Sequence, residues 1–364
     1  MADVVISRDE TGTILVTATP DSGGPDFTRA VLDVGGATLS WPDVTDIGLP
    51  NAEIHDVAQA QQWLWAVYGE GVAKAVDEDV EASTEDTELA RLAGRLAFGH
   101  WAARWWPASY LDGIPALATD LLGLELAALT YQCQQLFDDS LDELTTELIE
   151  EHQAALDPLI QWWRADGPVA HVLRLIDAAA DSAGLDSEPL NRLRSFLDDP
   201  ATGALIDPAE LFAPQDEFAL AAGEATGVTG RVIARGTGTN DWRRYPPGFV
   251  DASEDAVTWV ARAVGARRQV EITAAAGTLS PEVALAADVQ ANRVPLTKQD
   301  DQWTGSAELS GQDIDVAVLL PGFDPGVGDD VRAEREAIRE LARQRLTLGS
   351  AEPFLAEIVA ASGD

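Results

Sequence analysis

The sequence predicts an α+β protein with several domains: a short N-terminal β module, an all-α helical domain and a C-terminal antiparallel β-sandwich with a helical tail. Three observations predict this class. Hydrophobic residues alternate near the start of the chain, recur every three or four residues through its middle, and alternate again after residue 230. The 364 residues are 46% hydrophobic and include 11 Trp, enough for large cores. Helices and strands do not alternate one by one, which argues against a Rossmann fold or TIM barrel.

Residues 1–50 are expected to form the small β module. Val4 and Ile6 alternate with polar residues, and Ile14 and Val16 repeat the pattern after a turn-forming Thr-Gly pair. This spacing of two residues places the apolar side chains on one face of a strand. A hairpin or small sheet is therefore predicted here.

Residues 51–200 are expected to form the helical domain. Apolar residues at spacings of three and four predict helices over the ranges 56–76, 85–106, 119–137, 141–165, 168–183 and 188–197. Pro158 is expected to kink or split the fourth helix, because proline removes a backbone N–H from the helix interior. Pro168 suits the first turn of the fifth helix, where that N–H has no helical partner.

Residues 201–227 are expected to be a linker, and residues 228–328 a β-sandwich. The linker is rich in Asp-Pro and Ala-Pro pairs and has one short helical stretch. Six or seven short alternating strands with turn residues between them follow. Residues 329–364 then return to helical spacing and form the predicted C-terminal tail.

The composition excludes some partners and cell compartments. The chain has 24 basic and 62 acidic residues, a formal net charge of −38. Such a surface repels nucleic-acid phosphates and anionic membranes, so neither is expected as a partner. The first residues resemble no secretory signal, and the most apolar stretch, 113–137, is interrupted by Asp120 and Glu125. A cytoplasmic protein is therefore expected; the sequence leaves its oligomeric state open.

The residues of common catalytic and metal sites are few. The chain has four histidines, which are scattered, and one cysteine. None of the histidines lies in a Glu-x-x-His pair of the kind that ferritin-like metal sites use. The densest group of ligand-type residues, Glu147, Glu150, Glu151 and His152, is interpreted as a solvated helix face. We expect no metal and no cofactor.

Residues 99–113 form the first of two candidate binding segments. His100 and Arg104 share one face of a predicted helix, and Trp106 and Tyr110 lie at its exit. Aromatic residues combined with arginine are typical of interface hot spots. They are equally typical of a buried aromatic core. A protein-partner surface, a small-molecule pocket and a core all remain open.

Residues 241–248 form the second candidate segment, which contains four candidate binding residues: Trp242, Arg243, Arg244 and Tyr245. Its Pro-Pro pair keeps it out of a central strand, so an edge or loop is expected. The two arginines can bind a carboxylate or phosphate of a partner. The alternative is an internal pairing with Asp251, Glu254 or Asp255.

These features suggest two classes of function and a third, weaker one. The first is a non-catalytic interaction or adaptor component of a multi-protein bacterial system, which a convex surface at Trp106 and Tyr110 would favour. The second is a hydrolase of a small polar substrate that uses carboxylates and the His100 region. A pocket holding His100 beside a buried carboxylate would favour it. The third is a ligand-sensing β-sandwich, which needs exposed, coplanar Trp side chains on the sandwich.

Overall fold

The computed structural model describes residues 2–21, 23–76, 81–84, 87–137, 141–163, 167–199, 207–212, 231–265, 267–277, 284–290, 292–309, 314–323, 331–347 and 352–362. The chain divides into two compact units, each built from discontinuous segments. Unit 1 contains Met1–Ala103, Leu117–Ala213 and Arg345–Asp364, and unit 2 contains Arg104–Ala116 and Pro214–Gln344. Each unit is described separately below.

Unit 1 contains a six-stranded antiparallel sheet. Its strands are β1 (Ala2–Arg8), β2 (Ile14–Thr17), β3 (Ala30–Val34), β4 (Ala37–Trp41), β5 (Asn51–Ile54) and β6 (Glu81–Thr84). The spatial order is β3-β4-β5-β2-β1-β6. Val4, Ile6, Ile14 and Val16 are buried, as their alternation predicts, and β6 completes the edge beside β1.

The helices of unit 1 follow the periodicity of the sequence. They are α1 (Val57–Tyr68), α2 (Glu70–Ala75), α3 (Glu88–Trp105), α4 (Thr119–Gln132), α5 (Leu141–His152), α6 (Leu156–Trp162), α7 (Pro168–Ser182), α8 (Glu188–Asp198), α9 (Pro208–Leu211) and α11 (Leu355–Ser362). The apolar helix α4 contacts α5, α7 and α11 and lies at the centre of the helical layer.

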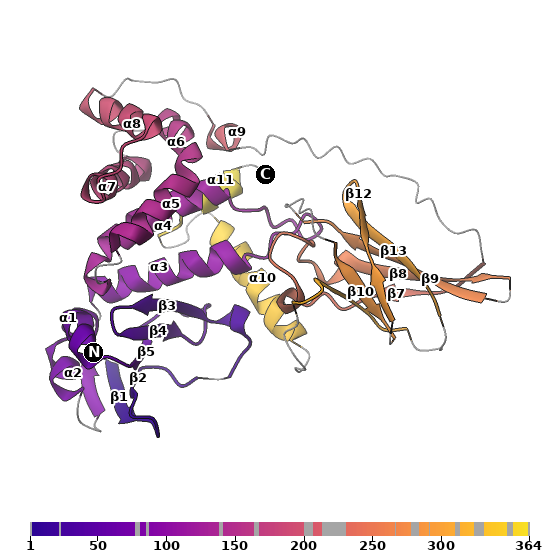
Figure 1. Cartoon of the computed structure of the whole chain (residues 1–364), viewed down its shortest axis with the longest axis horizontal. Coiled ribbons are helices and arrows are strands. Elements are labelled where there is room, and N and C mark those ends of the chain that lie inside the picture. Colours follow the sequence, from indigo (N-terminus) through magenta and orange to yellow (C-terminus); the bar gives the residue numbers. More distant parts are fainter. Residues whose placement is uncertain are drawn as a thin grey trace. The chain divides into compact units, whose positions relative to one another are not determined.

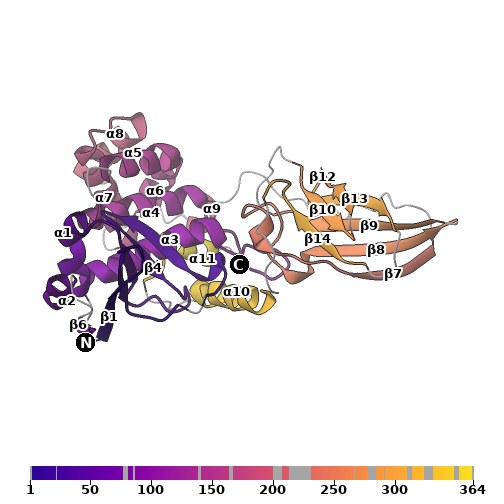
Figure 2. The ribbon, with the colours of Figure 1, turned by 60° about the horizontal axis from the view of Figure 1, so that its bottom comes forward.

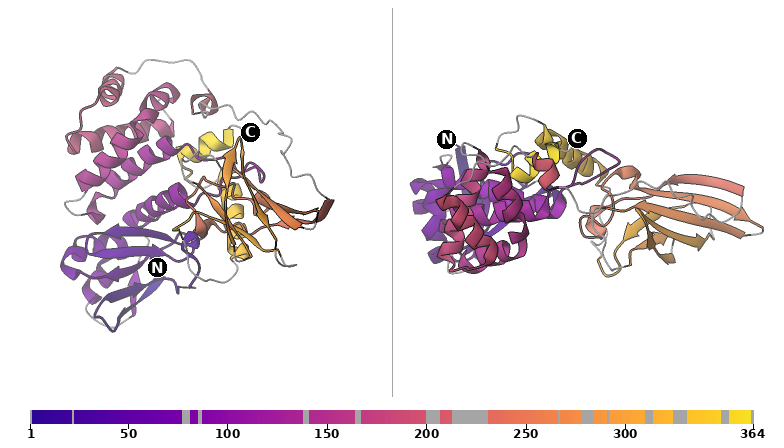
Figure 3. Two further views of the ribbon diagram at one scale, coloured as in Figure 1. Left: turned by 45° about the vertical axis from the view of Figure 1, so that its right-hand side comes forward. Right: turned by 90° about the horizontal axis from the view of Figure 1, so that it is seen from above.

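Helix α3 lies between the sheet and helices α4 and α5 (Figures 1 and 3). Two glycines allow the close approach on both sides. A methyl group at Gly94 would come 2.7 Å from Ile47 on the sheet side, and one at Gly99 would come 2.5 Å from Leu126 of α4. The Trp101 indole N–H also donates to the Phe27 carbonyl at 2.8 Å. The core of unit 1 is therefore built on both faces of α3.

A buried carboxylate fixes the C-terminal helix α11 in this core. Glu125 of α4 is 2% exposed and accepts hydrogen bonds from the backbone N–H groups of Leu355 at 2.7 Å and Ala356 at 3.1 Å. These N–H groups belong to the first turn of α11 and have no partner within the helix. Burial raises the pKa of Glu125 to about 8, against the opposing effects of the two N–H groups and of Arg95.

Unit 2 contains two antiparallel sheets that form a sandwich. The five-stranded sheet has the order β12-β13-β9-β8-β7, and the three-stranded sheet has the order β11-β10-β14. The strands are β7 (Arg231–Thr237), β8 (Val257–Val264), β9 (Arg267–Ala275), β10 (Ala286–Val289), β11 (Asn292–Pro295), β12 (Thr297–Gln299), β13 (Gln302–Glu308) and β14 (Val316–Leu319). Helix α10 (Arg332–Leu346) follows them in the chain, and its residues up to Gln344 belong to unit 2.

Threonines form a row across all five strands of the larger sheet. Thr237, Thr258, Thr273, Thr304 and Thr297 lie directly opposite one another in successive strand pairs. They occupy the face opposite to the buried Val257, Ala261 and Val270. Such cross-strand threonine pairs stabilise a sheet while keeping its outer face polar.

The predicted fold class is confirmed: N-terminal strands, a helical region and C-terminal antiparallel sheets follow one another, with a final helix. The fourth predicted helix is split, as expected from Pro158: it is interrupted at Gln153–Ala155, and Pro158 lies in the first turn of α6, where its missing N–H costs nothing. One local detail differs from expectation. Strand β6 was not expected between two helices.

The predicted domain limits remain a prediction, and most of the expected linker at 201–227 lies outside the described residues. Within the described part of the chain, no helix combines the length and apolar character needed to cross a bilayer.

Candidate interaction site

A tight hairpin turn exposes two large apolar side chains in unit 2. Ser109 and Ile114 pair as an isolated antiparallel bridge, with both backbone hydrogen bonds at 2.8 Å. The four residues between them form the turn, and Gly113 has a φ of 63°, a conformation that glycine adopts without strain. Tyr110 is 74% exposed and Leu111 is 54% exposed. We call this segment, residues 109–114, the Tyr110 turn.

The buried carboxylate of Asp251 holds the Tyr110 turn in place. One oxygen accepts hydrogen bonds from the Ser109 hydroxyl at 2.7 Å and from the Ser253 N–H at 2.9 Å. The other accepts from the backbone N–H of Tyr110 at 2.7 Å, with a longer contact from Leu111 at 3.5 Å. Asp251 is 3% exposed, so it makes these bonds away from bulk water. These hydrogen bonds hold the backbone of the turn in this conformation.

Two buried arginines of α10 support the same region. Arg335 forms a bidentate ion pair with Glu254, with N–O distances of 2.5 and 3.1 Å. Arg339 donates to the Ala252 carbonyl at 3.1 Å and lies 3.5 Å from the Asp112 carboxylate of the Tyr110 turn. Neither side chain reaches the surface, and each has an acidic partner, as buried charges require. The arginines therefore link α10 both to the turn and to the residues that hold it.

A further buried group completes this polar core. The Asn240 side chain is fully buried and donates to the carbonyls of Asp251 at 3.0 Å and Ser253 at 2.5 Å. Tyr245 donates its hydroxyl to the Asn240 side-chain oxygen, and burial raises the pKa of Tyr245. Tyr245 is thus a neutral structural group. Trp242 is also buried and lies beneath the guanidinium of Arg339, at 5.9 Å.

The two adjacent arginines that the sequence singles out lie against a different acid from those expected. The Arg243 guanidinium donates to both carboxylate oxygens of Asp241, from Nε at 3.0 Å and from Nη2 at 2.8 Å. Nε of Arg244 lies 3.8 Å from the same carboxylate. Burial disfavours ionisation of Asp241, but the hydrogen bonds of Arg243 outweigh it and hold the pKa of Asp241 below its usual value. Any role of Arg243 and Arg244 in partner binding stays a prediction.

The residues of the first candidate segment divide between the units. His100 lies on the exposed face of α3 in unit 1, and no hydrogen bond joins it to a carboxylate within the described ranges. Arg104 is exposed and stacks on Trp105, with 4.7 Å between the guanidinium and the ring. Trp106 is 8% exposed, and its indole N–H donates to the Pro115 carbonyl at 2.9 Å. Trp106 therefore closes the base of the hairpin, and Tyr110 stands at its tip.

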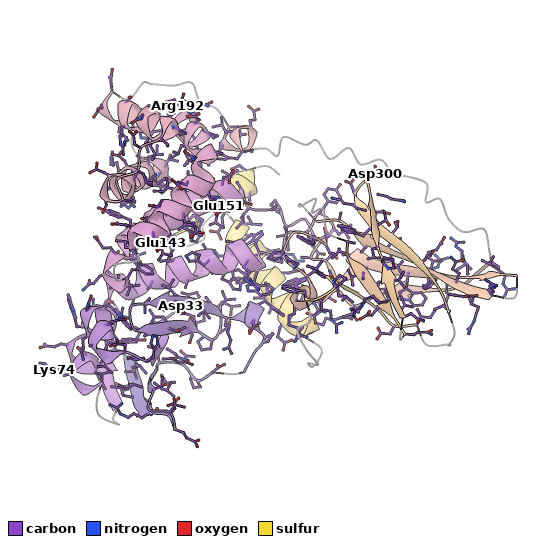
Figure 4. All side chains as sticks on the ribbon, viewed as in Figure 1. Asp33, Lys74, Glu143, Glu151, Arg192 and Asp300 are labelled. Carbon is purple, nitrogen blue, oxygen red and sulfur yellow. The ribbon has the colours of Figure 1, made fainter. Side chains whose placement is uncertain are left out.

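The acidic cluster on α5 is a solvent-facing surface apart from its histidine. Glu147, Glu150 and Glu151 are exposed; the labels of Glu143 and Glu151 in Figure 4 mark the two ends of this helix. His152 turns inward instead, with Nδ1 3.1 Å from the Asp120 carboxylate of α4. Its ring packs where a methyl group on Gly123 would stand, 1.9 Å away. Within the described part of the chain, no group of three or more ligand-type side chains is placed to hold a metal ion.

Several residues of the site were not singled out from the sequence as binding residues: Ser109, Leu111, Asp112, Asn240, Arg335 and Arg339. A weak signal exists for the Tyr110 turn, because Tyr-Leu-Asp-Gly ends in a glycine after a polar turn former. Asp251 was named only as a possible partner of the adjacent arginines. Nothing local distinguishes it from the other 61 acids, since its partners lie 142 and 141 positions away.

The arrangement suits recognition. Its carboxylates are occupied by fixed donors, and its exposed tip offers an aromatic ring and an aliphatic side chain rather than a reactive group. A comparison with protein-family models, with curated proteins and with solved structures finds no match for this chain.

Proposed function

We propose that this protein is a non-catalytic interaction or adaptor component, and that a protein partner binds the Tyr110 turn. A single observation carries the proposal: a buried carboxylate, Asp251, fixes a turn whose two tip residues, Tyr110 and Leu111, are exposed. Single exposed apolar residues are common on proteins and need no explanation. Tyr110 and Leu111 differ from such residues because buried hydrogen bonds hold them on one turn. Ordering that turn costs conformational entropy, and burial of the two side chains does not offset this cost.

The energetics of association support this interpretation. A partner that binds a mobile loop must order it, which costs roughly 0.5–1.5 kcal/mol for each immobilised side chain. The hydrogen bonds to Asp251 and the bridge between Ser109 and Ile114 order the backbone in advance. Tyrosine also contributes a large contact area with few rotatable bonds. The turn thus has the features of an interface anchor.

The alternatives receive less support from the geometry. The hydrolase hypothesis needs a carboxylate that orients His100, and the described residues supply no hydrogen bond of that kind. The ligand-sensing hypothesis needs exposed, coplanar indole rings of Trp242, Trp259 or Trp303 on the sandwich. Trp242 and Trp303 are buried, at 6% and 2% exposure, and Trp259 is half-buried. A cytoplasmic location, and the absence of nucleic-acid and membrane partners that the charge predicts, belong to the same proposal.

A site-specific photo-crosslinker tests the proposal directly. Incorporation of a photoreactive phenylalanine analogue in place of Tyr110 is expected to give discrete crosslinked products in the native cell. The matched control carries the same analogue in place of Trp65 on α1, an aromatic residue of unit 1 that is 54% exposed. Equal products from both positions, or none from position 110, would refute a partner at the turn.

A binding comparison then measures the contribution of the tip. The Tyr110→Ala, Leu111→Ala double variant should lose the partner identified by crosslinking and keep its melting temperature, because both side chains are exposed. Removing a hot-spot aromatic typically costs about 2 kcal/mol or more of binding free energy. Trp65→Ala should bind that partner as the wild type does.

A further inference from the structure

Strand β7 is an exposed edge of the sandwich in unit 2. It is the last strand of the five-stranded sheet and pairs on one side with β8 (Figure 2). Its first five residues, 231–235, are all exposed, including the apolar Val232 at 38% and Ile233 at 40%. An edge strand carries a row of backbone N–H and C=O groups that can pair with another extended chain.

The sheet to which β7 belongs differs in charge from the rest of the protein. Its five strands carry four more basic than acidic residues, whereas the whole chain has a net charge of −38. The bases are Arg231, Arg235, Arg262, Arg267, Arg268 and Lys298, and the acids are Glu271 and Glu308. The two acids are already paired, Glu271 with Arg262 and Glu308 with Arg267.

The two arginines of β7 differ from Arg262 and Arg267: within the described ranges, no acidic side chain forms an ion pair with Arg231 or Arg235. An irregularity between Val232 and Ala234 shifts the register, so that Arg231 lies opposite Ala263 and Arg235 lies opposite Val260. Because Ala263 and Val260 are three positions apart, they lie on opposite faces of the sheet. The two guanidinium groups therefore flank the edge, one on each face.

We propose that β7 binds an acidic, extended peptide segment of a partner protein, which adds to the sheet as a sixth strand. Backbone hydrogen bonds to β7 supply affinity, and the arginines supply specificity. A segment that follows the register of β8 places residues three apart against Arg231 and Arg235. The recognised pattern is thus two acidic residues separated by two others, one acid for each face. Val232 and Ile233 contact the residues between them.

The same arginines disfavour the other occupants of this edge. Pairing of β7 with β7 of a second copy brings two pairs of like charges to one seam, which is destabilising. Nucleic acid is repelled by the charge of the whole chain, and its phosphates offer no strand to pair. An acidic strand is also repelled by the chain as a whole, but it can pair with the backbone of β7 and brings charges opposite to those of the two arginines. This surface shares no residue with the Tyr110 turn, and its test is independent of the proposed function.

Fluorescence anisotropy with the full-length protein tests the proposal. The probe is a labelled, end-blocked peptide of alternating Thr and Val that carries glutamates three positions apart. A second peptide of the same composition carries its glutamates two positions apart, on one face of a strand. The first should bind about fivefold or more tightly than the second, since it alone reaches both arginines. Salt near 0.15 M limits the repulsion by the chain as a whole.

Two further probes separate strand addition from other causes. The first peptide with alternate backbone nitrogens methylated should lose binding, because methylation removes the N–H donors that a ladder needs. Unchanged binding of the methylated peptide would show simple charge attraction and overturn strand addition. Tighter binding of an oligothymidylate than of the peptide would overturn the choice of partner in favour of nucleic acid.

Charge reversal on the protein completes the test. Arg231→Glu, Arg235→Glu should weaken binding of the first peptide about tenfold or more, with an unchanged circular dichroism spectrum. The matched control is Arg174→Glu, which reverses an exposed arginine of α7 that also has no ion pair in the described ranges. The milder Arg231→Gln, Arg235→Gln variant keeps the test valid if the reversal impairs folding. Binding that is equal in all variants, or absent in the wild type, would overturn the proposal, as would dimerisation that needs these arginines.

Discussion

Arg332 and Arg335, one turn apart on α10, bind the same carboxylate, that of Glu254, yet the Arg332 side chain is 63% exposed and the Arg335 side chain is 1% exposed. The pair thus compares an exposed and a buried cation against a single acid. Arg335→Met should lower the free energy of unfolding by about 3 kcal/mol, because it removes the buried, bidentate partner of Glu254 and leaves only the longer buried contact with Arg339, at 3.4 Å. Arg332→Met should lower it by less than about 1 kcal/mol. Urea denaturation of both variants measures the difference, and equal losses would contradict the role given to burial.

Asp251→Asn should loosen the Tyr110 turn. An amide group can accept through only one of its two polar atoms, so the donors that now share two carboxylate oxygens lose part of their hydrogen bonding. A loss of about 1–3 kcal/mol is expected for buried donors left unsatisfied. Hydrogen exchange at the Tyr110 N–H should quicken at the same time. Asp255→Asn, an exposed neighbour, serves as the control and should change neither quantity.

Glu125 should make stability depend on pH. Burial raises the pKa of Glu125 to about 8 from the usual 4.5, so the folded chain holds a proton in this range that the unfolded chain releases. The free energy of unfolding contributed by Glu125 therefore falls as the pH rises from 4.5 to 8 and is constant above that. Denaturation of wild type and Glu125→Gln across this window should show a steeper fall for the wild type. Glu147→Gln, an exposed substitution on α5, should keep the wild-type slope.

Gly123→Ala should destabilise the helical layer despite the better helix propensity of alanine. The added methyl group would stand 1.9 Å from the His152 ring, so the ring must move and lose its contact with Asp120. Overpacking of this kind typically costs about 1–3 kcal/mol. Gly71→Ala in α2 meets its nearest atom at 3.4 Å and should be neutral or stabilising by up to about 1 kcal/mol. Thermal unfolding measures both, and a gain for Gly123→Ala would contradict the packing described here.

Regular periodicity made most of the elements predictable. The helix expected over 168–183 is α7, Pro168–Ser182, because proline suits its first turn and apolar residues recur at helical spacing. Strand β6 could not be predicted in the same way. Its four residues, Glu-Ala-Ser-Thr, show no apolar alternation, and they become a strand only because β1 offers a free edge.

The candidate site was predictable only at its exposed points. Tyr110 stood out because aromatic residues cluster around it, whereas Arg335 and Arg339 lie in a helix segment with five arginines, where nothing local shows which are buried. Burial there depends on Glu254 and Asp112, which are distant in the sequence. Long-range pairs of this kind are fixed by the packing of the whole unit, and a single sequence carries no signal for them.

The division of the chain into interleaved units has a consequence for synthesis. Unit 1 requires the final segment Arg345–Asp364, and unit 2 requires the early segment Arg104–Ala116. On the ribosome, the helical layer of unit 1 emerges long before α11 can reach the carboxylate of Glu125. The strands of unit 2 likewise wait for α10 to neutralise Glu254.

Neither unit can therefore close until α10 and α11 have been synthesised, and before that Glu125 and Glu254 lack the donors that they have in the folded protein. Domains that fold as independent segments avoid such a delay. In this chain, a truncation that removes α10 and α11 therefore leaves two unfinished folds rather than one.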